Sequence, residues 1–195
     1  MAPPRKHDTD RILDSARRIV LYDGPRAASV AAIARESNAP IGTLYHRFGS
    51  RDRILAAAWL RAVQRFQSGA LEAVRLTDPV EAAVGMAVSQ VSFAREQPED
   101  ARLLLALRRN DLLDADPDDS FRALLGMTNA PLEATLRRFA DELRGRTDPR
   151  ALDLITLAVV DLPNAAVRRH TREGGELPSW LEEEIATAVR KLLRP

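Results

Sequence analysis

The amino-acid sequence predicts an all-α protein with two helical domains. Apolar residues recur at three- and four-residue spacings through most of the 195 residues, as on the buried face of a helix. No alternation of apolar and polar residues is long enough for a sheet, and aromatic residues make up only 5% of the chain. Capping patterns divide the chain into about nine helices, three in an N-terminal domain of residues 1–50 and six in a domain of residues 51–195.

The first three helices are expected to be short and closely spaced. The segment "DTDRILDSARRIVLYDG" carries one apolar stripe, and Gly24 is expected to end its helix. "SVAAIARES" predicts a second helix with Ser29 as its N-cap. Asn38 tolerates the left-handed conformation and Pro40 favours the first turn of a new helix, so "NAP" is expected to turn the chain. Two short helices joined by a tight turn are typical of a helix-turn-helix motif.

The third helix, "IGTLYHRF", has side chains suited to a nucleic acid. At about 100° per residue, one side groups Ile41, Leu44, Tyr45 and Phe48, and the other groups Gly42, Thr43, His46 and Arg47. Hydroxyl groups and arginines bind phosphate oxygens, and a histidine can reach base edges. Gly42 costs the helix about 1 kcal/mol. Either another molecule approaches the backbone there, or the start of the helix tolerates glycine.

The segment "SVAAIARESNAPIGTLYHRFGSRDRIL", after a helix ending in "YDG", resembles the DNA-binding domain of the tetracycline-repressor (TetR) family of bacterial transcription regulators. The family pattern small-Thr-Leu-Tyr-x-x-Phe is matched at residues 42–48, and Ser50-Arg51-Asp52 stands where the family has Ser-Lys-Glu. The resemblance implies that Ser29 opens the second helix of the motif and belongs to the DNA-binding residues. It implies phosphate contacts by Thr43, Tyr45 and Arg51, and a major-groove face formed by Ile41, Gly42, His46 and Arg47.

Some residues depart from the family pattern. The usual Gly-Val turn is Asn38-Ala39, and Pro40 replaces a common serine. Ile41 is apolar where a polar residue is frequent, which favours contact with a thymine methyl group. Arg51 replaces the customary lysine, so the charge is kept and its geometry is changed.

Charge is distributed unevenly along the chain. Residues 1–53 carry a net charge of +4 and residues 54–195 a net charge of −3, although the whole chain is at +1. The basic N-terminal part is therefore expected to meet a polyanion. Arg5 and Lys6 are expected to precede the first helix, either as an arm along the minor groove or as a solvated tail.

Several other classes of protein are excluded or disfavoured. No apolar run approaches the roughly 18 residues of a membrane span, and no signal peptide is recognisable, so a cytoplasmic protein is expected. The absence of cysteine excludes disulfides and thiolate catalysis. The three histidines are scattered and no phosphate-binding loop is present, so we expect no enzyme activity, no metal and no cofactor. The acidic segment "DLLDADPDDS" lacks the turn glycine of a calcium loop, which favours a solvated helix connection.

The second domain is punctuated by capping residues and prolines. "DPVE" at 78–81 and Ser179 with Glu182 both predict capping boxes, and Asp148-Pro149 predicts another helix start. Pro131 is expected to kink or split its helix, and Pro163 lies inside another.

Two further sites are expected in this domain. The resemblance implies a small-molecule pocket between helices, although each large apolar residue could equally belong to the core. The candidates for a largely apolar ligand are Trp59, Phe66, Met86, Phe93, Leu104, Phe121 and Met127. In the family the last two helices pair with those of a second copy, although they could also pack within one chain. The candidates for that homodimer interface are Leu152, Ile155, Val159, Leu162, Leu181, Ile185 and Val189.

The sequence therefore predicts a homodimeric regulator that binds double-stranded DNA at a palindromic operator, most simply a repressor released by a small molecule. The alternative is a helical carrier or an enzyme with a borrowed helix-turn-helix fold. The operator, the ligand, the regulated genes and the sign of regulation are not specified by the sequence.

Overall fold

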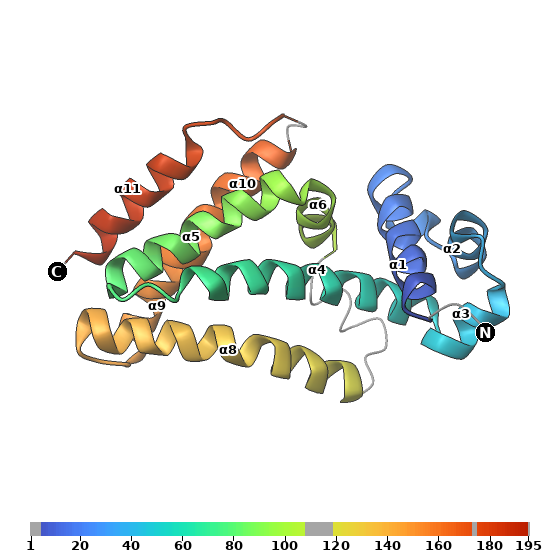
Figure 1. Cartoon of the computed structure of the whole chain (residues 1–195), viewed down its shortest axis with the longest axis horizontal. Coiled ribbons are helices and arrows are strands. Elements are labelled where there is room, and N and C mark those ends of the chain that lie inside the picture. Colours follow the sequence, from blue (N-terminus) through green and yellow to red (C-terminus); the bar gives the residue numbers. More distant parts are fainter. Residues whose placement is uncertain (1–4, 108–118, 173–174, 195) are drawn as a thin grey trace. The chain divides into compact units, whose positions relative to one another are not determined.

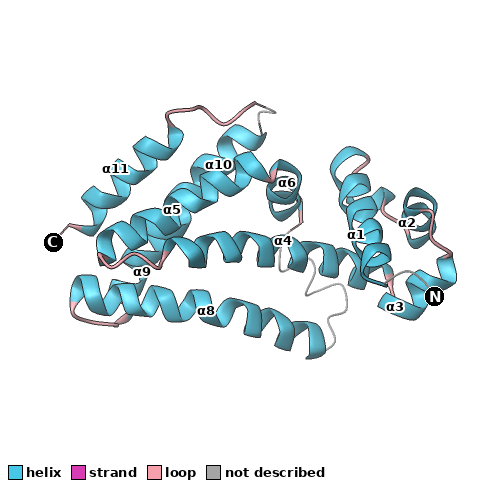
Figure 2. Ribbon diagram, viewed as in Figure 1, coloured by secondary structure: helices cyan, strands magenta, loops and turns pink. Residues whose placement is uncertain are grey.

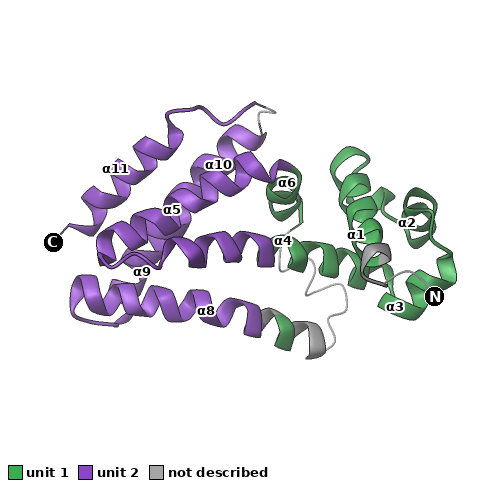
Figure 3. Cartoon of the chain, viewed as in Figure 1, with its two compact units in different colours: residues 1–63, 99–125 green, residues 64–98, 126–195 purple. Residues whose placement is uncertain are grey.

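The structure is a computed structural model, and it describes residues 5–107, 119–172 and 175–194. All regular elements in these ranges are helical, which confirms the all-α prediction (Figure 2). None of these helices is long and apolar enough to cross a membrane. The chain divides into two compact units (Figure 3): unit 1 contains residues 1–63 and 99–125, and unit 2 contains residues 64–98 and 126–195. Unit 1 is larger than the predicted domain of residues 1–50, whose functional boundary stays a prediction.

Unit 1 is built around the N-terminal helices and two later segments (Figure 1). Its elements are α1 (Arg5–Tyr22), the short 3₁₀ helix η1 (Pro25–Ala27), α2 (Val30–Ser37), α3 (Ile41–Phe48), the first part of α4 (Arg51–Ala73) and nearly all of α6 (Pro98–Ala106). Its core consists of apolar side chains that the spacing of the sequence had predicted to face inward, among them Ile12, Ala16, Ile33, Leu44 and Leu55.

The helix-turn-helix forms because local side chains satisfy its helix ends. The Ser29 hydroxyl accepts a hydrogen bond from the Ala32 amide at 3.1 Å, which confirms it as the N-cap of α2. Asn38 ends α2 at φ 53° and ψ 37°, in the left-handed conformation predicted for it. The Ser50 hydroxyl accepts a hydrogen bond from the Arg53 amide at 3.3 Å and so caps α4.

One boundary of the first helix was predicted wrongly. Arg5 and Lys6 were expected to precede the helix, but α1 begins at Arg5, so the backbone of both residues belongs to its first turn. Their side chains lie outside the described residues, as do residues 111–118 of the acidic segment.

Unit 2 is a helical bundle in which α5 (Pro79–Glu96) contacts the C-terminal helices. Its other elements are the second part of α4, most of α8 (Asp119–Arg144), α9 (Pro149–Thr156), the π-helix η2 (Leu157–Asp161), α10 (Leu162–Arg172) and α11 (Leu181–Leu193). Helices α10, η2 and α11 all contact α5. Buried side chains from this group of helices include Met86, Val91, Ile155, Val159 and Val189.

The predicted helix starts in unit 2 are only partly correct. The carboxylates of Asp78 and Asp148 accept hydrogen bonds, both at 2.9 Å, from amides three residues later, which confirms both caps. Ser179 does not cap α11, because that helix begins at Leu181 after Trp180 and has no side-chain cap. Glu182, the other half of the expected capping box, instead accepts a hydrogen bond from Arg95 of α5 at 2.6 Å.

The two internal prolines have different outcomes. Helix α8 continues through Pro131 and is not split. Pro163 lies in the first turn of α10, directly after the π-helix. Because proline has no N–H, it cannot bond the carbonyl of Val159 four residues earlier. The buried side chain of Gln90 donates to that carbonyl at 2.6 Å, so α5 supplies the hydrogen bond that the proline cannot.

Candidate nucleic-acid interface

The outer face of α3 is left uncovered by the rest of unit 1. Leu44 is fully buried and Phe48 packs against the same core. Ile41 and Tyr45, which the helical wheel groups with them, are instead 48% and 53% exposed. Only two residues one turn apart anchor this eight-residue helix, so the inward face is narrower than the wheel suggested. The exposed face includes Gly42 and His46, and Thr43 is half-buried beside it.

Space over Gly42 is open. A Cβ atom added there would meet no atom within 4 Å, so packing inside the chain does not require a glycine at this position. The helix nevertheless bears the cost of about 1 kcal/mol that glycine imposes relative to alanine. The backbone of α3 is thus directly accessible to another molecule at its second residue.

Both arginines predicted to meet DNA have partners within unit 1. Arg47 donates to the hydroxyl of Thr9 in α1 at 2.7 Å. Arg51 donates to the carbonyls of Ala28 and Pro25 at 3.0 and 2.5 Å, and it is paired with Asp52 at 2.5 Å. Arg51 therefore makes more hydrogen bonds within unit 1 than the sequence predicted.

A cation that the sequence analysis did not single out lies beside the helix-turn-helix turn. Arg11 of α1 lines a small cleft of about 160 Å³ together with Ser37, Asn38, Ala39 and Pro40. Its place depends on how α1 packs against α2, which the residue pattern of α1 does not specify. Arg11 is exposed, and the cleft places it near Pro40, directly before α3.

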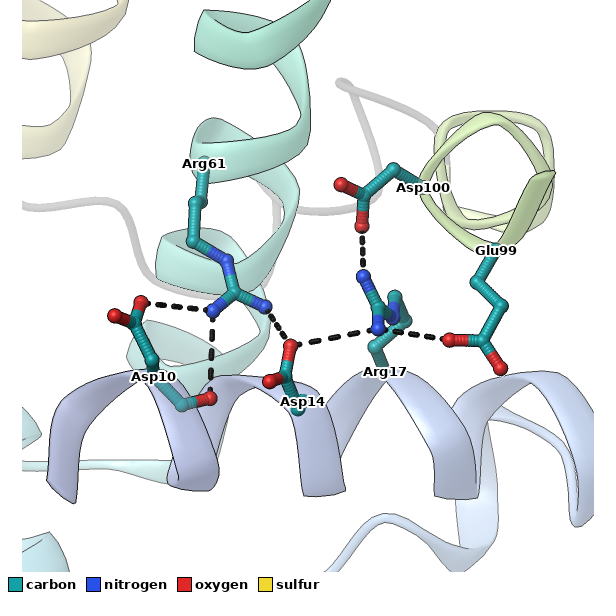
Figure 4. Close-up of polar contacts among 6 residues, drawn as sticks. All are labelled: Asp10, Asp14, Arg17, Arg61, Glu99 and Asp100. Atoms are coloured by element: carbon teal, nitrogen blue, oxygen red, sulfur yellow. Dashed lines mark hydrogen bonds and ion pairs between the residues drawn. The ribbon is translucent and has the colours of Figure 1, made fainter. Parts of the chain in front are cut away.

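A chain of ion pairs fixes α1 within unit 1 (Figure 4). Arg61 of α4 pairs with Asp10 and Asp14 of α1 at 3.0 and 2.5 Å. Arg17 of α1 pairs with Asp14 at 3.4 Å, and with two carboxylates of α6, as the close-up shows: Glu99, at 2.7 Å, and Asp100. The Asp100 side chain is only 1% exposed. The pair of Arg17 and Asp100 could not be predicted from local sequence patterns, because 83 residues separate its members.

The charges around Arg17 keep it protonated. Burial disfavours its charged form, but the hydrogen bond to Asp100 and the negative charges of Asp100, Asp14 and Glu99 outweigh that effect and raise the pKa of Arg17 above its ordinary value. The network therefore holds fixed charges that orient α1, the helix to which Arg47 of α3 is bonded.

The candidate pocket residues do not form one group. Trp59 and Leu104 belong to unit 1, where the Trp59 indole donates to the Leu107 carbonyl at 3.1 Å. In unit 2, the rings of Phe66 and Phe93 meet edge-to-face with centroids 5.6 Å apart. The remaining three differ in burial: Met86 is buried, Met127 is 69% exposed, and the side chain of Phe121 lies outside the described residues.

One cavity in unit 2 includes a candidate residue. It measures about 760 Å³ and lies between α4 and α5, and Phe93 is part of its wall. Its other walls are mixed in character, with Val88 and Ala73 beside polar groups such as Arg65, Ser89 and Glu96. These walls are more polar than the largely apolar pocket that the sequence suggested.

The candidate dimer residues mostly face the interior of their own chain. Five of the seven are buried, namely Ile155, Val159, Leu181, Ile185 and Val189, and the other two, Leu152 and Leu162, are half-buried. Of the elements that carry them, η2, α10 and α11 contact α5, and α9 contacts η2. The exposed apolar side chains of the same helices are Leu154, Leu157 and Leu192. The assignment of the seven candidates to a homodimer interface stays a prediction.

Comparisons with known proteins agree with the geometry of the N-terminal region. Residues 12–58 match the model of the family described as "Bacterial regulatory proteins, tetR family". No curated protein sequence is significantly similar to this chain.

Solved structures share the fold along the whole chain at low sequence identity. A TetR family transcription regulator from Marinobacter aquaeolei VT8 is 17% identical with a TM-score of 0.73, covering 96% of this chain and 95% of its own. A TetR-like transcriptional regulator from Rhodococcus sp. RHA1 is 20% identical with a TM-score of 0.70, covering 98% and 96%. The fatty acid degradation regulator FadR from Bacillus halodurans is 15% identical with a TM-score of 0.71, covering 99% and 97%.

The helix-turn-helix of α2 and α3, its local caps and the family match lead to one conclusion: residues 12–58 of this chain form a helix-turn-helix region of the kind found in the tetR family of bacterial regulatory proteins.

Proposed function

We propose that this protein is a homodimeric, ligand-responsive repressor that binds a palindromic operator in the cytoplasm. The observation that carries the proposal is the uncovered face of α3, where Ile41, Gly42, Tyr45 and His46 are all exposed. In a helix-turn-helix protein, the second helix of the motif enters the major groove. A symmetric dimer would present two copies of α3 about 34–36 Å apart or farther by whole turns of DNA, which is why a palindrome is expected.

The side chains of this face suit two kinds of contact. Thr43 and Tyr45 offer hydroxyls to phosphate oxygens, which bind all sequences alike. His46 offers a ring nitrogen to base edges, and Ile41 offers an apolar surface to a thymine methyl group. We assign sequence discrimination to His46 and Ile41, and to Arg47 when it exchanges its bond to Thr9 for one to a base edge.

The proposed effector is a small molecule with a substantial apolar part. The solved regulator FadR of Bacillus halodurans is named for fatty acid degradation, which supports an effector of this kind. The cavity beside Phe93 supports a molecule that also carries a polar group, because serines, Arg65 and Glu96 share its wall.

Helix α4 is the element through which we propose that the effector acts. Its residues belong to both units, from Arg51 beside the helix-turn-helix to Ala73 at the cavity wall, and it has no glycine or proline before Gly69. A ligand can lower operator affinity only through its different affinities for the two states, and a tenfold loss needs about 1.4 kcal/mol of coupling. Phe66→Ala should leave operator binding intact and blunt release by a cognate effector. If Phe66→Ala changed neither the affinity for the effector nor the effector-induced release from the operator, Phe66 would be an ordinary core residue and not part of the pocket.

The proposed function is tested on the DNA upstream of the protein's own gene. Binding that is competed by the same unlabelled duplex and not by random duplex supports a specific regulator. Equal competition by both duplexes would contradict it. The mass of the free protein at micromolar concentration tests the dimer, and a purely monomeric species would contradict that part of the proposal.

A further inference from the structure

Arg51 is the first residue of α4, and its side chain contacts the segment that precedes α2. Its guanidinium donates through Nε to the Ala28 carbonyl at 3.0 Å and through one terminal nitrogen to the Pro25 carbonyl at 2.5 Å. Its other terminal nitrogen pairs with Asp52 at 2.5 Å. Each of its three nitrogens therefore has a partner within unit 1, and the positive charge is next to a carboxylate.

The two carbonyls belong to the segment that leads into α2. Pro25 opens η1, and Ala28 immediately precedes Ser29, the N-cap of α2. Arginine can span two acceptors because its donors form a rigid planar fork, whereas the lysine ammonium is a single flexible point. The replacement of the family's lysine by arginine thus fits a brace between the start of α4 and the start of α2.

We propose that Arg51 is a positioning residue, which holds residues 25–28 and the N-terminus of α2 against α4 and makes no phosphate contact of its own. This inference rests on the proposed DNA binding. It reassigns a residue for which the resemblance implied a direct contact. The reason is that counterion release follows the cations that neutralise phosphates, and the cation of Arg51 is already neutralised by Asp52.

The experiment compares Arg51→Ala with Arg51→Lys in the full-length protein. Operator affinity is measured over a range of salt concentrations, and amide exchange is measured at Ala32 and Ile33, whose N–H groups bond to Ser29. We expect both variants to lose roughly tenfold in affinity with an unchanged salt slope, and to exchange faster at both amides. Arg53→Ala is the matched control, since it removes one exposed arginine of the same helical turn and should leave the exchange at α2 unchanged.

A double-mutant cycle separates positioning from a general loss of stability. Ser29→Ala and Arg51→Ala are combined and measured at a temperature where circular dichroism shows every variant folded. If Arg51 acts through the start of α2, the double variant loses less affinity than the product of the single losses. A double variant whose loss of affinity equals the product of the two single losses would contradict an action of Arg51 through the start of α2.

Two results would overturn the inference. One is that Arg51→Lys keeps the affinity and salt slope of the unmodified protein while Arg51→Ala lowers the slope by about one, as expected for a lost phosphate contact. The other is unchanged exchange at Ala32 and Ile33 in Arg51→Ala. If the unmodified protein bound no specific duplex, the proposed function would fail, and the exchange measurement would still decide whether the brace exists.

Discussion

Arg47 of α3 donates a hydrogen bond to the Thr9 hydroxyl of α1 over 2.7 Å, so the recognition helix is bonded to the first helix as well as packed beside α2. The partner is a neutral hydroxyl, so this bond places no carboxylate beside the Arg47 guanidinium. This differs from Arg51, whose charge is paired with Asp52. Arg47 can exchange its bond to Thr9 for one to DNA at little electrostatic cost, because a hydroxyl is a weaker partner for a guanidinium than a phosphate or a guanine edge.

Asp100→Asn should destabilise the protein strongly. The substitution removes the buried carboxylate that bonds Arg17, while Glu99 and Asp14 stay paired with it, so we expect the loss of one charged hydrogen bond, about 1.5–3 kcal/mol. The free energy of unfolding in urea measures the effect. Glu72→Gln breaks the exposed pair with Arg75 and is the control, with an expected change below about 0.5 kcal/mol. A similar small change in both variants would show that the buried pair does not stabilise unit 1.

Gly42→Ala should separate stability from DNA binding. The added methyl group meets no atom of the chain, and alanine favours the helix by about 1 kcal/mol, so the melting temperature should rise. Operator affinity should fall, because the methyl group would occupy the space through which DNA approaches the backbone. Gly126→Ala of α8 makes the same change at another open helical position and should leave operator affinity unchanged. Unimpaired binding by Gly42→Ala would mean that the helix start merely tolerates glycine.

The pair of Glu81 and Arg190 should make stability sensitive to acid. The hydrogen bonds from Arg190, at 2.7 Å, lower the pKa of the Glu81 carboxyl below its usual value of 4.5. A lowered pKa in the folded state means that the stabilisation is present above about pH 4.5 and is lost as the pH falls through the folded-state value. Thermal unfolding of Glu81→Gln should therefore depend less on pH below 4.5 than that of the unmodified protein. Glu142→Gln, which removes a longer contact of 3.8 Å, is the control, and equal pH profiles for Glu81→Gln and the unmodified protein would contradict the prediction.

Local features of this fold were predictable because their causes lie within a few residues. Ser29, Asp78 and Asp148 cap helices through amides three residues later, and the left-handed Asn38 follows from its own side chain. The pattern after Ser179 looked equally sound, yet Glu182 is bonded to Arg95, which lies 87 residues earlier. A capping motif indicates only which local hydrogen bonds a side chain can make. The same side chain can instead bind a cation that is distant in sequence, as Glu182 does.

The candidate sites were harder to predict because they depend on contacts between residues that are far apart in sequence. Helical periodicity identified the apolar stripe through Ile155 and Val159, but periodicity does not say whether a second copy or the chain's own α5 covers it. It likewise grouped Tyr45 with Leu44, although only Leu44 reaches the core. The composition of α3 predicted a nucleic acid as its partner. The role of each side chain could not be predicted in the same way, because it depends on contacts such as that of Arg47 with Thr9.

The assignment of the α3 face is tested most directly by comparing four variants on two duplexes. Thr43→Ala and Tyr45→Phe should weaken binding to operator and random DNA by the same factor, because phosphates carry no sequence information. His46→Ala and Arg47→Ala should weaken operator binding selectively, by roughly 1–3 kcal/mol of discrimination for each lost base contact. The measurement is the ratio of the two affinities for each variant at one salt concentration. We expect an unchanged ratio for Thr43→Ala and Tyr45→Phe and a reduced ratio for His46→Ala and Arg47→Ala. Equal losses on both duplexes for all four variants would contradict the assignment of this face.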